Sequence, residues 1–441
     1  MTVTLAIAGA GIRGRNHARY AAACGARITA VAEPRAEARA AFAAEFGVPA
    51  QNVFESWEEL GGAGRLADAV VIATQDAMHA DPAVAFAGLG YHILLEKPMA
   101  PNEADSRRIA EAAERAGILL TVCHVLRYTA YTRALKAVVD SGRIGDIAAI
   151  QHLESVGWWH QAHSFVRGNW AVEADSSPML LAKSCHDIDW LMHIMGRSPS
   201  RVSSFGSLLH FRPENKPERA AERCLDCAVE AACPYSARRI YLNFLATQPN
   251  QWPLTVLTDD HSEAGVIAAL REGPYGRCVY SAGNDVVDHQ VVDMEFSGGA
   301  TASFTMSAFT RLEHRKTRVF GTRGMIEGDG VRLRITDFVT DTDEEIDTSE
   351  EAGSAGDHGG GDPALVAAFV EAVRTGDRSH VFTDGAASLA SHQVVWAAEE
   401  ARRSGRVVWV DQRQDQIKGK SKACEEPAPS AGASVPSGNM R

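Results

Sequence analysis

The sequence lacks the features that mark membrane and nucleic-acid-binding proteins. No run approaches the roughly 20 apolar residues that span a bilayer. Met1 leads into an apolar segment without the basic region or cleavage site of a signal peptide. Acidic residues outnumber basic ones, 56 to 44, and the net charge of −12 is opposite in sign to a phosphate-binding surface. We therefore expect a cytoplasmic protein without membrane or nucleic-acid partners.

Cysteine is also scarce, with eight in 441 residues. Cytosolic thiols stay reduced, so we expect these to be free, metal-bound or catalytic and not paired in disulfides. What the chain does have is length and a hydrophobic fraction of 45%, which is enough for two packed domains.

The first apolar run ends in a glycine motif. The letters V-T-L-A-I-A precede Gly9-x-Gly11-x-x-Gly14, which predicts a strand that turns into a helix at a dinucleotide pyrophosphate. The first glycine allows the tight turn, the second lets the backbone approach the phosphates, and the third lets helix and strand pack closely. The phosphates would lie against the helix N-terminus, beside Ile12 and Arg13.

A second strand and an acid follow in the order that this motif requires. The Ala-rich segment 16–24 favours a helix, residues 28–32 are apolar, and Glu33 ends that strand. A carboxylate at this distance binds the ribose hydroxyls of NAD and would repel the 2′-phosphate of NADP. NAD is therefore the expected cofactor, and Arg35 keeps NADP as the less favoured alternative.

Strands and helices alternate up to about residue 124. The apolar strands cover 68–74, 92–95 and 118–122, and the helix-forming segments cover 34–46, 81–90 and 102–117. This alternation predicts an α/β fold whose N-terminal domain, residues 1–124, is a Rossmann doubly wound parallel sheet. Ligands bind beyond the carboxyl ends of such strands. Further cofactor candidates at these ends are Thr74, His79, Glu96 and Lys97.

Several motifs together resemble the glucose–fructose oxidoreductase / inositol dehydrogenase (Gfo/Idh/MocA) family. They are G-A-G-I-R-G at 9–14, A-T-Q-D-A-M-H at 73–79, L-E-K-P at 95–98, R-Y at 127–128, S-G-R-I-G at 141–145, H-D-I-D at 186–189, F-V-E-A-V at 369–373 and S-H at 391–392. The resemblance implies a second α/β domain, residues 125–411, with a large open mostly antiparallel sheet. It also implies self-association through that sheet, as a homodimer or homotetramer. Residues 412–441 have the composition of a disordered tail.

The pattern of the second half agrees with a large sheet. Two sets of apolar residues alternate with polar ones on either side of a Gly-Gly turn: Val292, Met294 and Phe296, then Ala302, Phe304 and Met306. They predict a hairpin with one buried face. An apolar sheet face needs a cover, which favours an oligomer over cover by local helices. The acidic, Gly-rich residues 341–361 are expected to form a mobile surface loop.

Lys97 and His186 are the main catalytic candidates. The resemblance implies that Lys97 polarises the reacting oxygen, which lowers the energy of developing alkoxide charge. The alternative is a surface lysine paired with Glu96. His186 suits acid–base work because its ordinary pKa lies near neutrality.

One departure from the family concerns the partner of His186. The family's pattern is Asp-x-x-x-His, and Ala182 stands where the aspartate is expected. We expect Lys183, the third catalytic candidate, to take its place, and Asp187 or Asp189 to hold the imidazole.

A Gly-broken aromatic stretch, residues 154–170, predicts a substrate pocket. Tryptophans flanked by hydrogen-bonding groups suit a sugar or cyclitol ring, which has apolar faces and a polar rim. An aromatic cluster that joins strand and loop is the alternative. The substrate-binding candidates are Tyr128, Trp159, His160, His163, Arg167, Asn169 and Asp189.

A cysteine cluster lies in an apparent insertion at about 210–241. The spacing suggests a structural zinc ion, and reduced buried thiols or a redox-sensitive pair are the alternative. The ligands would be Cys224, Cys227 and Cys233, with His210 or Cys278 as the fourth. We expect the insertion to cap the substrate site.

Together these features predict an NAD(P)-dependent oxidoreductase that transfers hydride between nicotinamide and a secondary hydroxyl of a sugar, sugar derivative or cyclitol. Two alternatives are open: a glycoside-cleaving enzyme that oxidises its substrate transiently, and a non-catalytic NAD-binding regulator.

Overall fold

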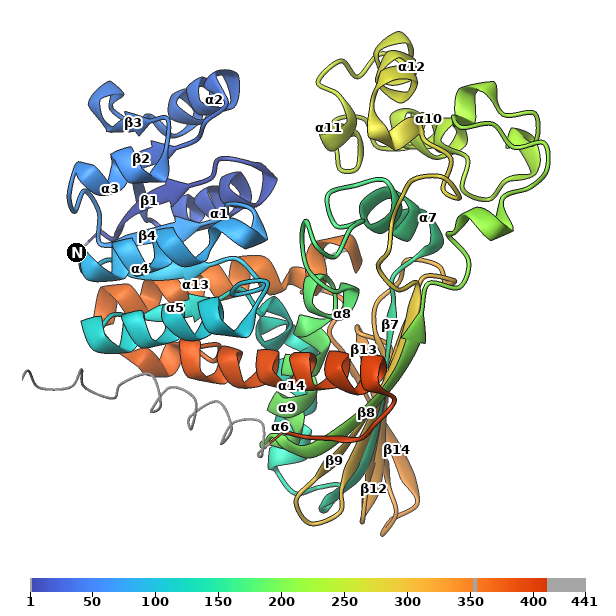
Figure 1. The fold of residues 1–441 in the computed structure, drawn as a ribbon. Helices are drawn as coiled ribbons and strands as arrows, with labels where there is room; N and C mark the ends of the chain where they lie inside the picture. The colour runs from blue at the N-terminus through green and yellow to red at the C-terminus, as the bar shows by residue number, and fades with distance from the viewer. Residues whose placement is uncertain (1, 352–354, 411–441) are drawn as a thin grey trace, which may run out of the picture.

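Two β-sheets organise the chain in the computed structural model, which describes residues 2–351 and 355–410 (Figure 1). The first is parallel throughout, in the order β3 (Val53–Phe54), β2 (Arg27–Ala32), β1 (Thr4–Ala8), β4 (Ala69–Ile72), β5 (His92–Leu95), β6 (Leu120–Val122). Its helices are α1 (Ile12–Ala23), α2 (Ala36–Phe46), α3 (Trp57–Gly62), α4 (Ala80–Gly88) and α5 (Glu103–Ala116). The predicted doubly wound parallel sheet is confirmed.

Local sequence explains where these elements begin and end. The central strands β1, β4 and β5 are apolar and buried on both faces, as parallel strands between two helix layers must be. Ser56 and Asn102 accept the backbone N–H groups of Glu59 and Asp105, which caps α3 and α5. Gly117 ends α5 in the left-handed conformation that favours glycine.

The second sheet has nine strands and is antiparallel except where β7 pairs with β10. The order is β14 (Thr342–Asp347), β13 (Arg332–Asp337), β12 (Gly324–Gly328), β11 (Lys316–Gly321), β7 (Ile147–Ser155), β10 (Thr301–Ser307), β9 (His289–Phe296), β8 (Pro199–Ser207), β15 (Val408–Trp409). The hairpin of β9 and β10 buries one face, as predicted. The expected large, mostly antiparallel sheet is confirmed.

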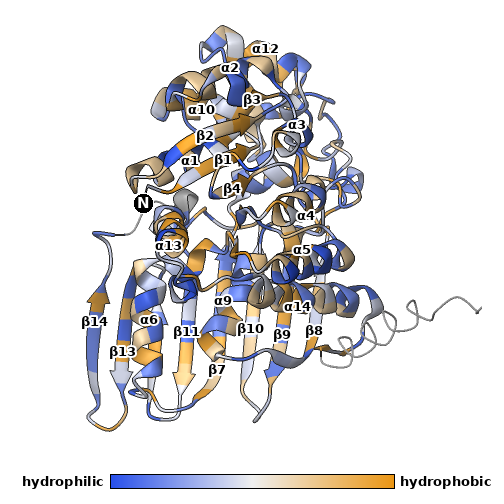
Figure 2. Ribbon diagram, turned by 90° about the vertical axis from the view of Figure 1, so that its left-hand side faces the viewer, coloured by the Kyte–Doolittle hydropathy of each residue, from blue (hydrophilic) through white to orange (hydrophobic). Residues whose placement is uncertain are grey.

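The apolar face of this sheet is covered by the chain's own helices. They are α6 (Ala130–Asp140), α8 (Met179–Ala182), α9 (Cys185–Met195) and α14 (Gly385–Ser404), while α13 (Gly361–Thr375) packs on α1. Figure 2 shows α6, α9 and α14 lying against the strands, and Ile188 and Val394 share a core with Phe304. The local-helix alternative therefore accounts for the cover, and the apolar-face argument for self-association was wrong. The oligomeric state stays a prediction.

An insertion leaves and re-enters the second sheet at neighbouring points. Ser207 at the end of β8 pairs with His289 at the start of β9, and residues 208–288 lie between them. They include α10 (Ala237–Thr247), α11 (Leu254–Leu257) and α12 (Glu263–Glu272), which pack around Tyr241 and Leu270. The insertion is thus longer than the predicted 210–241, because its second half is helical.

The acidic segment at 341–361 was assigned wrongly to a mobile loop. Residues 342–347 form β14, the edge strand, because β13 offers partners: Arg332 Nε lies 3.0 Å from Asp347 Oδ2, and Thr336 Oγ1 lies 2.6 Å from Asp343 Oδ1. The predicted tail 412–441 lies outside the described residues, and the domain boundary at 124 stays a prediction. Of the helices described, none is long and apolar enough to cross a bilayer.

Candidate active site

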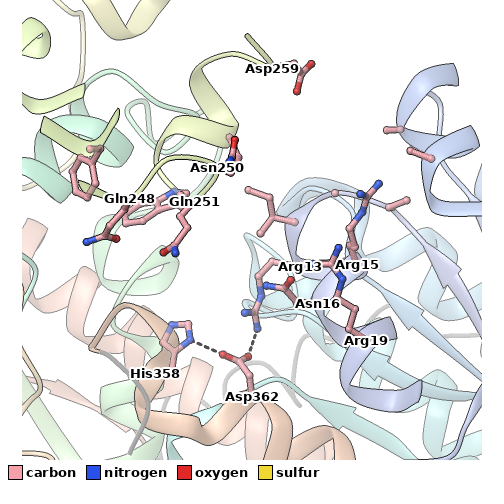
Figure 3. A pocket seen from close by; sticks show the side chains of 18 of the residues that line it. Arg13, Arg15, Asn16, Arg19, Gln248, Asn250, Gln251, Asp259, His358 and Asp362 are labelled. Carbon is pink, nitrogen blue, oxygen red and sulfur yellow. Dashed lines mark hydrogen bonds and ion pairs between the residues drawn. The ribbon is translucent and has the colours of Figure 1, made fainter. Parts of the chain in front are cut away.

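A cavity of about 1330 Å³ separates the glycine loop from the insertion (Figure 3). One wall is the start of α1 with residues of α2, the opposite wall is α10 and the segment up to Asp259, and His358 and Asp362 lie at its base. Typical small-molecule sites measure about 300–1,000 Å³. This cavity is large enough for a dinucleotide and a substrate together.

The glycine loop has the geometry that a pyrophosphate requires. Gly9 has a φ of +94°, and its N–H donates to Ala32 O at 2.9 Å. A Cβ on Gly14 would lie 1.9 Å from the carbonyl oxygen of Gly9. Gly11 is the N-cap of α1 and offers no side-chain cap, so a bound anion can take the first N–H groups of the helix. Ile12 and Arg13 also line the cavity.

Glu33 lies at the end of β2, as expected, but its carboxylate is already bonded. Ala10 N donates to Oε2 at 2.9 Å and Arg35 Nε donates to Oε1 at 2.7 Å. Burial alone would raise the pKa of Glu33, but the hydrogen bonds and charge of Arg35 hold it below its ordinary value. Because an acid and a cation share this corner, the geometry accommodates either NAD or NADP.

His79 and Thr74 hold two strand-end loops together. The ring of His79 is fully buried, with Nδ1 at 2.8 Å from Pro98 O and Nε2 at 3.2 Å from Thr74 O. Thr74 Oγ1 donates to Met78 O at 3.2 Å. The imidazole therefore connects the E-K-P loop to the loop after β4, and its predicted role at the cofactor stays a prediction.

Glu96 belongs to a buried ionic network beneath the glycine loop. Its Oε1 accepts Arg13 Nε at 2.6 Å and lies 2.6 Å from His17 Nε2, and Arg13 Nη2 donates to Asp362 at 2.5 Å. Burial opposes ionisation, but Arg13 and His17 hold the pKa of Glu96 well below its ordinary value. The predicted cofactor ligand Glu96 thus acts through Arg13. Sequence reasoning missed His17 and Asp362.

Lys97 lies close enough to His186 for its charge to act on the imidazole. Lys97 Nζ donates to Ala182 O at 2.6 Å, which places the ammonium at the C-terminal end of α8, four residues before His186 in the chain. The imidazole is 2% exposed, and burial, with the charge of Lys97 next, holds its pKa well below the ordinary value. Neighbouring Lys183 pairs with Glu154 at 3.0 Å.

The expected carboxylate partner of His186 is absent. Asp187 lies 3.1 Å from His152 Nε2 and accepts Arg315 Nε at 2.8 Å. Asp189 is held by both arms of Arg127, at 2.6 and 2.7 Å. The prediction that either aspartate holds the imidazole was wrong, because Arg315 and Arg127 bind these carboxylates. The assignment of Asp189 to the substrate stays a prediction.

The aromatic stretch divides between cavity and core. Trp159 lines the cavity with Trp252 and Phe244 of the insertion, at ring-centroid distances of 5.2 and 4.7 Å. The ring of His160 lies 5.0 Å from that of Trp252. Asn169 is exposed. The predicted aromatic wall therefore exists, and the insertion supplies half of it.

The other three pocket candidates are bonded to groups of the protein, and their substrate-binding role stays a prediction. His163 Nδ1 lies 2.6 Å from Tyr241 Oη, which pins α10. Arg167 donates to Arg277 O at 2.7 Å and to Tyr235 O at 2.8 Å. Tyr128 Oη accepts Phe382 N at 2.9 Å and is 3% exposed. None of the three lines the large cavity.

The insertion's cysteines line a separate small cavity. Cys224, Cys227, Cys233 and Cys278 border about 20 Å³ of space. Within the described ranges, the one set of three metal-ligand types whose ligand atoms all lie within 4.8 Å of one another is His17, Glu96 and Cys123, already bonded to Arg13. The structure therefore gives the predicted zinc site no support.

Comparisons with known proteins agree with this geometry. A Bacillus subtilis (strain 168) protein named YteT is 26% identical over 313 residues, 68% of this chain and 71% of that protein. An inositol 2-dehydrogenase of Streptomyces avermitilis is 37% identical over 145 residues, which are 32% of this chain and 41% of that enzyme. The fold matches a levoglucosan dehydrogenase in complex with NADH and levoglucosan, with a TM-score of 0.68, 18% identity, and coverage of 93% and 100% of the two chains.

Two family models match nearly the whole described chain. Residues 3–124 match the NAD-binding Rossmann fold of an oxidoreductase family, and residues 136–411 match the C-terminal α/β domain of the same family. The chain therefore belongs to the Gfo/Idh/MocA family of NAD-binding oxidoreductases.

Proposed function

We propose that this protein is a dehydrogenase that transfers hydride between a nicotinamide nucleotide and a secondary hydroxyl of a sugar, sugar derivative or cyclitol. The observation that carries the proposal is the position of Lys97, whose ammonium is held 2.6 Å from Ala182 O beside His186. His358, whose ring centroid lies 5.4 Å from that of His186, lines the cavity that begins at the glycine loop.

The residues present fit a nicotinamide nucleotide. Gly9, Gly11 and Gly14 would hold its pyrophosphate, and Glu33 or Arg35 its adenosine ribose. When bound, the nucleotide accepts or donates hydride. Lys97 is the group that donates a hydrogen bond to the substrate oxygen and stabilises developing alkoxide charge.

The cavity wall that the insertion forms, opposite the glycine loop, is suited to a polyol. Trp159 and Trp252 offer apolar ring faces, and Gln248, Asn250 and Gln251 supply amide donors and acceptors from the insertion (Figure 3). Aromatic faces beside amides match a sugar or cyclitol ring. The similarity to an inositol 2-dehydrogenase supports the same substrate class.

The test is reduction of nucleotide by purified full-length protein. Myo-inositol, levoglucosan and D-glucose would each be mixed with NAD or NADP and the absorbance at 340 nm recorded. Lys97→Met should lower kcat by roughly 10²–10³-fold and leave the Kd for NADH unchanged. Lys136→Met, which removes a surface lysine paired with Asp140, is the matched control. Equal kcat values for the two variants would contradict the proposal.

The alternative functions give different results in the same assay. Release of sugar from a glycoside without net NADH would favour the glycoside-cleaving route, for which His160 or Lys183 is the candidate additional base. Nucleotide binding without any absorbance change on addition of a polyol or glycoside would favour a regulator.

A further inference from the structure

A histidine and an aspartate at the start of α13 form a pair that the proposed function does not use. His358 Nδ1 lies 3.0 Å from Asp362 Oδ2, and both residues line the large cavity (Figure 3). Asp362 is 3% exposed and its other oxygen accepts Arg13 at 2.5 Å. The carboxylate is therefore fixed from the glycine-loop side, and it fixes the imidazole in turn.

His186, in contrast, has no such support. Neither of its ring nitrogens has a hydrogen-bond partner within the described part of the chain. After burial, the groups that lower its pKa are Lys97, His358, His124 and Arg315, none of which is a carboxylate. An imidazole that takes up a proton during a reaction is normally held by a carboxylate, which sets its tautomer and stabilises the imidazolium. His186 therefore suits a neutral contact with the substrate.

The imidazole of His358 is a direct neighbour of that of His186. Their ring centroids lie 5.4 Å apart, so a hydroxyl that reaches His186 is within reach of His358. Besides Asp362 and His186, the charged and titratable groups around His358 are Arg13, Lys183 and His160.

The protonation state of His358 agrees with the role of a base. Burial lowers its pKa and the charge of Asp362 opposes that effect. A lowered pKa favours the neutral ring, and the contact with Asp362 favours the tautomer in which Nδ1 donates to the carboxylate. Within the described residues no hydrogen bond is made by Nε2, which can therefore accept a proton. Asp362 then stabilises the cation that forms.

We propose that His358, held by Asp362, is the base for the substrate hydroxyl, in place of a carboxylate-supported His186. The hydroxyl O–H bond breaks and its proton passes to Nε2 of His358. The carbinol C–H bond breaks, its hydride passes to the nicotinamide, and the carbon–oxygen double bond forms. Lys97 donates to the oxygen throughout. This assignment rests on the proposed dehydrogenase function.

The experiment compares His358→Ala and Asp362→Asn with His380→Ala in the full-length protein. His380 has an aspartate 3.9 Å away, on the surface, and is the matched control. We expect His358→Ala to lower kcat roughly 10²–10⁴-fold with KM and the Kd for NADH within about twofold, and added imidazole to restore part of kcat. Asp362→Asn should lower kcat less than His358→Ala does. The acid limb of its pH profile of kcat should shift, because the imidazolium of His358 loses its carboxylate partner.

A second readout needs no turnover. NMR of protein labelled with ¹⁵N-histidine should show one ring, absent in His358→Ala, as the Nδ1–H tautomer, and Asp362→Asn should change that ring's signals and leave those of His380 unaltered. A wild-type enzyme that reduces nucleotide with none of the polyols overturns the proposed function and the base together. Turnover by the wild type with His358→Ala keeping more than a tenth of its kcat, no rescue by imidazole, or an Nε2–H tautomer overturns the base alone.

Discussion

Replacing Glu96 by glutamine tests the ionic network beneath the glycine loop. Glu96 is 6% exposed, and the variant keeps its shape but leaves Arg13 with one carboxylate, that of Asp362. Losing one partner of a buried ion pair costs about 3–5 kcal/mol. Because Arg13 retains Asp362 and about a third of its side chain stays in water, we expect a loss of about 2 kcal/mol. In a chain of 441 residues such a loss corresponds to a fall in Tm of about 2 °C.

The stabilisation by Glu96 should depend on pH in a definite direction. The folded-state pKa of Glu96 lies below its ordinary value of 4.5, so its stabilisation is complete above that pH and is lost as the pH falls towards the folded-state pKa. The difference in Tm between wild type and Glu96→Gln should therefore have its full size at pH 7 and should shrink at acid pH. Equal Tm values at pH 7, or a gap that widens on acidification, would refute the reasoning.

Three further predictions concern the cofactor loop and the insertion. Gly14→Ala should abolish NADH binding in a fluorescence titration, because its Cβ would meet a backbone oxygen at 1.9 Å, whereas Gly62→Ala meets nothing within 4 Å and should bind normally. Arg35→Ala should lower the affinity for NADP about tenfold or more and that for NAD about threefold at most, since the 2′-phosphate alone needs the guanidinium. Tyr241→Phe leaves buried His163 unpaired, so it should cost about 1–3 kcal/mol and speed proteolysis within 237–272. An unchanged rate of proteolysis would contradict the prediction for Tyr241→Phe.

Most of the N-terminal fold could be predicted because its signals are local. The glycine motif, the apolar strands and the caps at Ser56 and Asn102 act within a few residues of one another. The same holds for the alternation in β9 and β10. The edge strand β14 has no such signal, since its acidic residues become a strand through cross-strand partners on β13.

The site residues also divide into those with a local sequence signal and those that depend on distant partners. Lys97 and His186 were found from motifs, but the partners of the neighbouring aspartates, Arg127 and Arg315, come from distant elements, and only the tertiary structure reveals such pairs. His358 stands four residues before an aspartate at the start of an amphipathic helix, so the segment could be expected to approach the cleft, but its Gly-rich composition favoured a flexible linker.

The insertion begins and ends at hydrogen-bonded neighbours in the second sheet. A short turn could therefore join β8 directly to β9 and leave the pairing of the nine strands intact. The wall of the cavity that α10 and the segment up to Asp259 form would then be absent. Exchanging this segment for another of different sequence would change which molecules are admitted while the glycine loop, Lys97 and the imidazoles stay where they are. We therefore expect the insertion to be replaceable as a unit, so that the choice of substrate could be changed without changing Lys97 or the glycine loop.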